Sequence, residues 1–554
     1  MTELHLCIGQ PRFADSDIAA IAARDGVPAA WRQAFEKYGA SAPARVTGDF
    51  AVAMTLADGR SFLAIDRFAI QTLCYRITDS RLQFAPRADA LADAGAELDP
   101  QAIFDYLYFH VIPSPRTIFK DVFRLPPGHS ARFENGKLAV APYWQPKFEE
   151  GQGESFSALR DEFRQTIRDA VTARLDGGPV GCYLSGGTDS STIAGMLTQI
   201  TGRPAETYSI GFDVPGYDEM EYAQIAVRHF GTHHHEYYIT PDDLVTGMPA
   251  VAASYDQPFG NSSAVPAYYC ARMAKQDGIE KLLAGDGGDE LFGGNTRYAK
   301  QRVFGAYDAL PGILRKGLAE PLADTGLFDR IPLLKKGASY VRQARVPMPD
   351  RMQTYNLLMR MGLGQIFTAD FLQQVDSGEP ERHQRAVYNA CPPASLINKM
   401  LAYDWRYTLA ENDLPKVIGS ARLANMAVGF PLLDDRLLDF SLKLPTAYKL
   451  KGFKLRWFFK EALRGFLPDE ILTKKKHGFG LPFGPWAVSH APLNQLATES
   501  LHGLADRGII RREFIDTLLK EHLPAHPGFY GELVWVMTML EQWLRVHAPG
   551  FKAS

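Results

Sequence analysis

Leu184-Ser185-Gly186-Gly187-Thr188-Asp189-Ser190-Ser191 is the stretch that decides the fold of this 554-residue chain. The run before it, VGCYL (180–184), is short, apolar and typical of a buried strand, and residues 190–198 place apolar side chains on one helical face. A strand, a Ser/Gly loop and a helix start form an anion site, because glycines admit a phosphate and the helix N-terminus offers free N–H groups. The spacing is neither a Walker A loop nor a dinucleotide-binding motif.

A second loop follows about a hundred residues later, AGDGGDELFGG (284–294), after IEKLL (279–283), which is predicted to be the next strand. It carries three acids within five positions, Asp286, Asp289 and Glu290, which repel one another unless a cation compensates. The EF-hand spacing does not fit. The alternatives are a polar turn that caps a helix and a solvated acidic turn. The two loops together favour a site for ATP phosphates, with Mg²⁺ beside the carboxylates.

These two loops resemble the synthetase domain of asparagine synthetases, and the resemblance continues along most of the chain. Further matching segments are TYSIGF (207–212), PLLD (431–434) and KKKHGFGLP (474–482). The resemblance implies an ATP-dependent ligase that adenylates a carboxylate for attack by an amine and releases AMP and pyrophosphate.

The same resemblance implies roles for individual residues. Lys476 and Asp286 would be catalytic, with Lys476 neutralising charge on the adenylate and the tetrahedral intermediate. Lys474 and Lys475 are predicted to be solvated neighbours. Asp189 and Asp289 would hold Mg²⁺. Nucleotide contacts are expected at Leu184, Ser185, Gly186, Gly187, Asp189, Ser190, Ser191, Ser209, Ile210, Gly211, Ala284 and Gly285.

Residues 1–145 resemble the family's glutaminase domain, through VTGDFA (46–51), DRF (66–68) and RLPPGH (124–129). This implies a sandwich of antiparallel sheets. The glutaminase needs a cysteine as its first mature residue, with the α-amine as base. Residue 2 is Thr2, and Cys7 lies inside LHLCIG (4–9). The stretch between Cys7 and Gly48 is too short to hold the glutamine-binding loops. We therefore expect a degenerate, structural amidotransferase-like domain; the rival is a Cys7 nucleophile exposed by processing.

Residues 150–554 form the predicted synthetase domain. Helix and strand patterns alternate to about residue 300, which indicates a parallel α/β sheet of the ATP-pyrophosphatase type with helices on both faces. The pattern beyond is mainly helical, and residues 531–547 predict one amphipathic helix with a single apolar side.

The substrate prediction depends on a segment that departs from the family. Between Lys416 and Pro431 asparagine synthetases carry a Glu-x-Arg pair, whereas this chain has AVG at 427–429. Fewer fixed charges argue against a small, doubly charged acid such as aspartate. Asp286 argues against β-lactam synthetases, which have a tyrosine there. This favours a lasso-peptide cyclase that closes a macrolactam, with a precursor peptide and its leader protease as possible partners. The alternatives are an ammonia- or glutamine-dependent asparagine synthetase and a non-catalytic nucleotide-binding relic.

Composition limits the remaining functions. A net charge of −3 gives no general attraction to nucleic acid. We expect no membrane span, since no apolar run approaches 18 residues, and no signal peptide. Five scattered cysteines predict reduced thiols and a cytoplasmic protein. His233, His234 and His235 are predicted not to bind a metal, because three adjacent histidines cannot all face one ion. The oligomeric state is left open.

Overall fold

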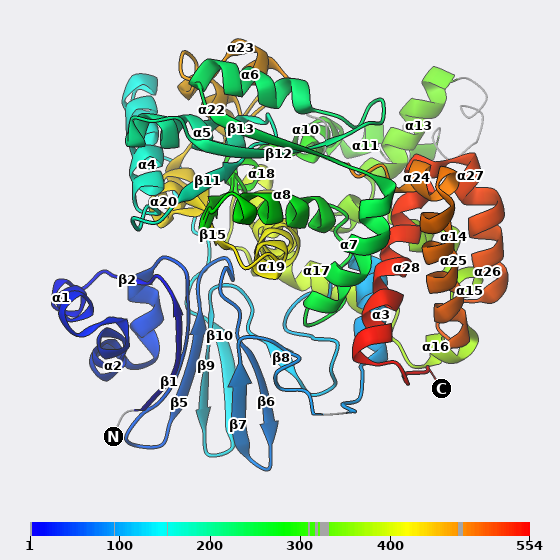
Figure 1. Ribbon diagram of the computed structural model, residues 1–554, viewed down its shortest axis with the longest axis horizontal. Coiled ribbons are helices and arrows are strands. Elements are labelled where there is room, and N and C mark those ends of the chain that lie inside the picture. Colours follow the sequence, from blue (N-terminus) through cyan, green and yellow to red (C-terminus); the bar gives the residue numbers. More distant parts are fainter. Residues whose placement is uncertain are drawn as a thin grey trace.

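The computed structural model describes residues 3–93, 95–151, 153–308, 311–315, 320–321, 332–474 and 480–553. An antiparallel β unit made by the N-terminal part of the chain lies below a parallel sheet flanked by helices, and a group of C-terminal helices stands beside both (Figure 1). The α/β-plus-β architecture expected from the sequence is confirmed.

The N-terminal unit contains two main antiparallel sheets, ordered β1-β4-β5-β9-β10 and β7-β6-β8. Alternate residues of β4 point to opposite sides: Ala51 and Ala53 pack in the cluster shared with the three-stranded sheet, and Phe50 and Val52 pack with Trp31 of α2. The sandwich therefore has a third, helical layer. The bounds are β1 (Glu3–Gly9), β2 (Arg12–Phe13), α1 (Ser16–Asp25), α2 (Val27–Tyr38), β3 (Val46–Thr47), β4 (Phe50–Thr55), β5 (Ser61–Ile65), β6 (Cys74–Thr78), β7 (Arg81–Ala85), β8 (Phe123–Arg124), β9 (His129–Glu134) and β10 (Lys137–Pro142).

The second unit is built on a five-stranded parallel sheet ordered β13-β12-β11-β14-β15. Helices α4, α5 and α6 cover one face, and α7, α8 and α19 cover the other (Figure 1). The strands are β11 (Val180–Tyr183), β12 (Glu206–Phe212), β13 (His233–Ile239), β14 (Lys281–Leu283) and β15 (Ala427–Gly429). The helices are α4 (Phe156–Thr172), α5 (Thr188–Thr201), α6 (Met220–Phe230), α7 (Pro241–Ser254), α8 (Ala264–Gln276) and α19 (Leu414–Leu423). The edge strand β15 comes from the part of the chain expected to be helical.

The C-terminal helix α28 (Pro527–His547) is buried on all sides along its middle, so the prediction of a single apolar side is wrong. Every residue from Leu533 to Leu544 is buried. The reason is its central position in one core cluster with α3 (Pro100–Phe109), α7, α24 (Phe483–Ser489) and α25 (Ala491–Asp506). Because α3 packs there, the N-terminal part of the chain supplies a helix to the C-terminal core.

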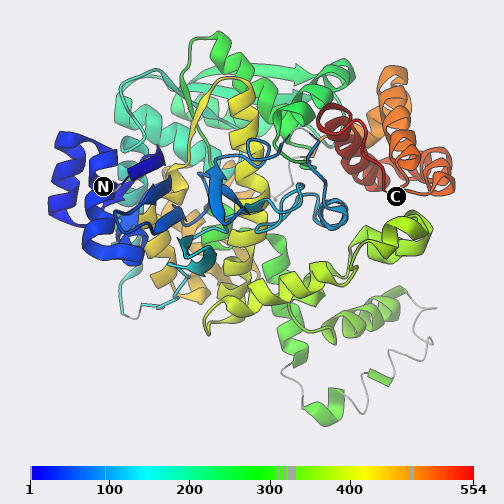
Figure 2. The same ribbon diagram turned by 90° about the horizontal axis from the view of Figure 1, so that it is seen from below.

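Further described helices of the middle of the chain form the green and lime segments in the lower half of Figure 2. They include α10 (Thr296–Asp308), α13 (Pro332–Ala344) and α17 (Glu379–Ala390). The chain returns through α18 (Leu396–Asp404) and the π-helix η5 (Trp405–Asp413) to α19. Within the described ranges no helix combines the length and apolar character needed to cross a membrane.

Candidate active site

A cavity of about 980 Å³ opens at the carboxyl ends of β11, β12 and β14. Open parallel sheets place their ligands at this edge. Most of the residues expected to bind nucleotide or metal line it: Leu184, Ser185, Gly187, Asp189, Ser190, Ser209, Ile210, Gly285 and Asp289. Asp286, predicted to be catalytic, lines it too. The other four, Gly186, Ser191, Gly211 and Ala284, lie beside the cavity but do not line it.

The first loop connects β11 to α5 and presents a helix N-terminus to the cavity. Gly187 is the N-cap residue, and no described side chain caps it, so the first N–H groups of α5 are open to a ligand. The backbone N–H of Ser185 donates to Ser190 Oγ at 3.1 Å, which fixes the hydroxyl in the loop. Gly186 has φ +69°, and a Cβ there would lie 2.4 Å from the Ala223 nitrogen, so only glycine fits.

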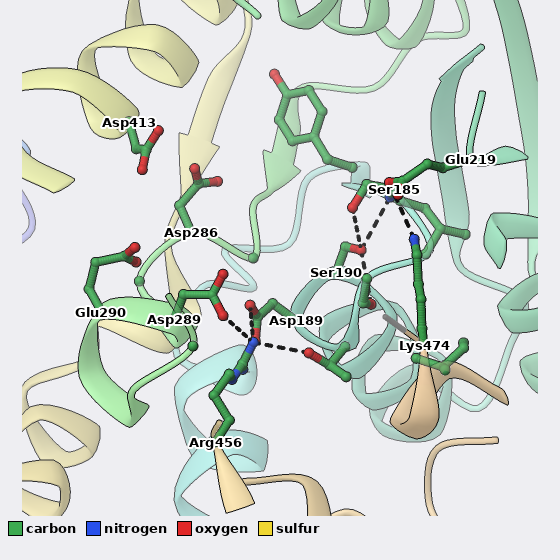
Figure 3. Close-up of a pocket in the computed structure, with 18 of the residues that line it drawn as sticks. Ser185, Asp189, Ser190, Glu219, Asp286, Asp289, Glu290, Asp413, Arg456 and Lys474 are labelled. Atoms are coloured by element: carbon green, nitrogen blue, oxygen red, sulfur yellow. Dashed lines mark hydrogen bonds and ion pairs between the residues drawn. The ribbon is translucent and has the colours of Figure 1, made fainter. Parts of the chain in front are cut away.

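The second loop connects β14 to the short helix α9 (Gly288–Phe292) and touches the first loop. A Cβ on Gly288 would lie 2.3 Å from Asp189 Oδ1, so the glycine permits this close approach. As a result Asp189 and Asp289, about a hundred residues apart in sequence, point to the same spot (Figure 3).

The guanidinium of Arg456 lies at that spot. Its Nη1 donates to Asp189 Oδ2 at 2.8 Å and to Asp289 Oδ1 at 2.7 Å, and its Nη2 also donates to Asp189. The side chain is 5% exposed. The basic segment that contains Arg456 was visible in the sequence, but nothing in the spacing singled this residue out. The three acids of the second loop do indicate that a cation is needed, and Arg456 supplies one in addition to any metal ion.

The donor set at this spot still suits Mg²⁺. Two carboxylates supply hard oxygen ligands, and Mg²⁺ commonly takes one or two carboxylates together with the phosphates of its nucleotide. Asp189 and Asp289 would then share their oxygens between the ion and Arg456.

A second charged group lines the same cavity, around Lys416 of α19. Lys416 Nζ donates to Asp286 Oδ1 at 3.1 Å and to Asp413 Oδ1 at 3.4 Å. Burial opposes the charge of the ammonium, but the two carboxylates outweigh it and hold its pKa above the ordinary value. Burial raises the pKa of Asp413. Asp286, predicted to be catalytic, is therefore paired with the ammonium of Lys416, for which the sequence predicts no role.

Glu290 faces this group from α9 (Figure 3) and is 7% exposed. Burial, with Asp289 nearby, raises the pKa of its carboxyl well above the ordinary value. This shift favours the protonated form of Glu290, and protonation limits the repulsion between the acids of the second loop.

The segment expected to close over the phosphates reaches the cavity at Lys474. Its Nζ lies 3.2 Å from Glu219 Oε2 and 4.2 Å from the ring centre of Tyr222, and its side chain is 8% exposed. The prediction that Lys474 is a solvated neighbour is therefore wrong: Glu219 and Tyr222 bury it against α6. Lys476, the predicted catalytic lysine, lies outside the described residues, as does Lys475.

The segment on which the substrate prediction depended is placed differently from what we expected. Its residues lie on α19 and β15, and among the described residues that line the cavity none comes from 418–429. Ala427 begins the edge strand, at the end of the sheet away from the cavity. The missing Glu-x-Arg charges therefore say little about the acid that binds.

Cys7 lies in the middle of β1, where it pairs with Val52 of β4. Burial raises the pKa of its thiol, and its nitrogen is an internal amide of the strand. The geometry lacks both features of the glutaminase nucleophile, a free amine and an activated thiol.

A Ser/Gly loop and a carboxylate pair at the ends of a parallel sheet, joined to an amidotransferase-like β unit, define the class of this protein. Residues 162–545 match the model of the asparagine synthase family, and residues 31–144 match that of the glutamine amidotransferase domain. The chain belongs to the asparagine synthase family.

Several relatives match most of the chain. The glutamine-hydrolyzing asparagine synthetase 1 of Bacillus subtilis (strain 168) is 25% identical over 490 residues, which cover 87% of this chain and 74% of the relative. A putative glutamine-hydrolyzing asparagine synthetase of Mycobacterium tuberculosis (strain H37Rv) is 25% identical over 485 residues, covering 84% and 72%. Amidase chry2 of Gibberella zeae is 20% identical over 510 residues, covering 84% and 74%.

Proposed function

We propose that this protein is an ATP-dependent ligase that adenylates a carboxylate for attack by an amine and releases AMP and pyrophosphate. One observation carries the proposal. The open N-terminus of α5 and the carboxylate pair Asp189–Asp289 face one cavity, so that phosphate donors and metal ligands lie side by side. Membership of the asparagine synthase family supports it.

The proposed role of each residue follows from its position in the site. The N–H groups of α5 and the Ser190 hydroxyl would bind phosphate, and Ser209 and Ile210 of β12 would contact the nucleoside. Mg²⁺, held by Asp189 and Asp289, would neutralise charge on the phosphates. Lys476 would act on charge that develops on the adenylate, because a positioned cation is most effective where charge appears in the transition state.

The products formed from ATP test this proposal. The full-length protein, ATP, Mg²⁺ and a panel of acids and amines are followed by phosphorus NMR. Cleavage between the α- and β-phosphates, seen as AMP and pyrophosphate, is the expected result. ADP and inorganic phosphate without AMP would overturn it. Asp289→Asn should abolish the signal, and Asp439→Asn, on the exposed side of α20 (Asp435–Lys443), is the matched control.

For the substrate we propose an intramolecular cyclisation, in which an Asp or Glu side chain of a peptide is joined to the peptide's N-terminal amine. The cavity is at the upper end of the size of small-molecule pockets, which leaves space for a substrate larger than aspartate. A tethered amine also has a high effective concentration. The second candidate is asparagine synthesis, favoured by the names of the relatives and by the charged group Asp286–Lys416–Asp413, which suits a small charged acid.

Mass spectrometry separates the two candidates. A peptide with an internal Asp or Glu, encoded beside this gene, should lose about 18 Da, the mass of one water, as the tethered amide forms. Aspartate with ammonia should give no asparagine at a useful rate. Asparagine formation without any dehydrated peptide would establish the second candidate and leave the adenylation proposal intact.

A further inference from the structure

His233 and His235 share one face of β13, and Glu206 of the neighbouring strand β12 lies on the same face. Residues i and i+2 of a strand point the same way, whereas His234 points to the other side, where its Nδ1 bonds with Thr207 Oγ1 at 3.0 Å. The register pairs Glu206 with His233 directly. The three adjacent histidines therefore do not share one face of the sheet, but two of them and the Glu206 carboxylate do.

Three ligand atoms converge there. Glu206 Oε2 lies 2.9 Å from His233 Nδ1 and 2.8 Å from His235 Nε2. One such atom from each residue lies within 4.8 Å of the other two. A tetrahedral Zn²⁺ with Zn–N and Zn–O bonds of about 2.0–2.2 Å holds its ligand atoms about 3.3 Å apart, so small shifts would admit the ion.

A metal site also needs partners that orient its ligating histidines, and His235 has such a partner. Its other nitrogen, Nδ1, lies 3.2 Å from Asp277 Oδ2. A carboxylate on the far nitrogen fixes the tautomer and orientation of a ligating histidine and strengthens it as a donor. The His235 ring also stacks on Tyr208, with ring centres 4.7 Å apart and planes at 12°. His235 is therefore held in place with Nε2 aimed at Glu206.

We infer that Glu206, His233 and His235 bind a divalent transition metal of the Zn²⁺ class, with Asp277 as the partner that orients His235. Imidazole nitrogens select such metals, whereas Mg²⁺ prefers oxygen ligands. The site lies at the amino ends of β12 and β13, whereas the Asp189–Asp289 pair lies at the carboxyl ends. His233 is 66% exposed, so the site opens to solvent and leaves a coordination position for water.

The test uses the full-length protein, freed of metal with EDTA and desalted, without nucleotide. Co²⁺ is titrated and followed by its visible absorption, and Zn²⁺ is followed by calorimetry. We expect one Zn²⁺ per chain, displacement of Co²⁺ by Zn²⁺, and no displacement by a large excess of Mg²⁺. A wild-type protein that binds neither ion would overturn the inference.

Variants assign the ligands. His233→Ala and Glu206→Gln should each weaken Zn²⁺ binding by more than tenfold, and Asp277→Asn should weaken it by about 10–100-fold as an outer partner. His502→Ala is the matched control, since His502 is partly exposed and pairs with Asp516 elsewhere. Circular dichroism checks that each variant is folded. Unchanged Zn²⁺ binding by folded His233→Ala and Glu206→Gln would place the ion elsewhere and refute the site.

Discussion

Arg456 neutralises the carboxylates that the two loops bring together. Its guanidinium forms ion pairs with Asp189 and Asp289, and its Nη1 also donates to Thr188 Oγ1 at 3.0 Å. The residue adopts φ +53° and ψ +36°, a left-handed conformation that is unusual for a side chain of this size. The backbone strain is tolerated at the start of α22 (Trp457–Ala462), where it directs the guanidinium to the loops.

Removing this charge should destabilise the protein and make stability depend on Mg²⁺. Arg456→Met keeps much of the stem but leaves the Asp189–Asp289 carboxylates without the guanidinium, and breaking a buried pair costs at most about 3–5 kcal/mol. The cost is reduced here because the carboxylates remain 19% and 22% exposed. We expect a lower melting temperature that millimolar Mg²⁺ partly restores, because a ligand that binds only the folded state stabilises it.

Thermal unfolding with and without Mg²⁺ measures this effect. Arg464→Met is the control, because Arg464 forms its pairs with Glu461 and Asp469 at the surface, where ion pairs contribute little. A melting temperature of Arg456→Met that does not rise with Mg²⁺ would show that the carboxylate pair does not take up the ion.

Individual site residues were predictable where a loop determines them. Asp189, Ser190 and Asp289 lie in or just after the loops that follow two predicted parallel strands. Their convergence at one edge of the sheet could therefore be inferred from the sequence. Arg456, Lys416 and Lys474 could not be, because each reaches the cavity from a different element far along the chain. Their partners are set by packing, which a single sequence does not reveal.

At the scale of elements, the basic segment 449–476 is divided among several short elements. They are α21 (Thr446–Lys449), β16 (Leu450–Lys451), β17 (Lys454–Leu455), α22 and α23 (Asp469–Thr473). A charge run predicts a solvated face, yet Lys449 at the end of α21 is fully buried. Its Nζ donates to Asn398 Oδ1 at 2.9 Å and lies 4.8 Å from the ring centre of Phe148. Neighbouring helices likewise bury α28 on all sides along its middle, including its polar Glu541 and Gln542.

The burial of Lys449 should appear in the pH dependence of stability. Burial lowers the pKa of its ammonium to about 7, and Glu150 opposes the shift. Between about pH 7 and the unfolded value near 10.4 the unfolded chain binds more protons, so the free energy of unfolding rises with pH. Relative to Lys449→Met, wild type should gain up to about 1.4 kcal/mol per pH unit in this window.

Urea unfolding at pH 7, 8 and 9 provides the measurement. Lys451→Met is the control for removing a lysine from the same segment, because Lys451 is exposed and lies over the Trp457 ring. A difference between wild type and Lys449→Met that stays constant from pH 7 to pH 9 would contradict the lowered pKa.

At the scale of the whole molecule, the two units are joined by ion pairs around the start of α20. Arg12 Nη1 donates to Asp434 Oδ2 at 2.9 Å, and the Gly48 N–H donates to Asp435 Oδ2 at 2.6 Å. Arg67 Nη1 lies 2.9 Å from Asp435 Oδ1. These contacts use two of the motifs that resemble the glutaminase domain, 46–51 and 66–68. Their position at this interface gives them a structural role that needs no glutaminase chemistry.

The last prediction follows from this structural role of the N-terminal unit: glutamine should not serve as a source of ammonia. Cys7 lies inside strand β1, and its thiol is half-buried and has a raised pKa. Its nitrogen is an amide, whereas the glutaminase needs a free amine as its base. Incubation of the full-length protein with glutamine, ATP and Mg²⁺ should release glutamate only at the background rate, and Cys7→Ala should leave AMP formation unchanged. Cys391→Ala, at a buried cysteine outside the N-terminal unit, is the control for the general effect of removing a thiol. A glutaminase activity that Cys7→Ala abolishes and Cys391→Ala preserves would show that the N-terminal unit is catalytic, and would return the asparagine synthetase candidate to first place.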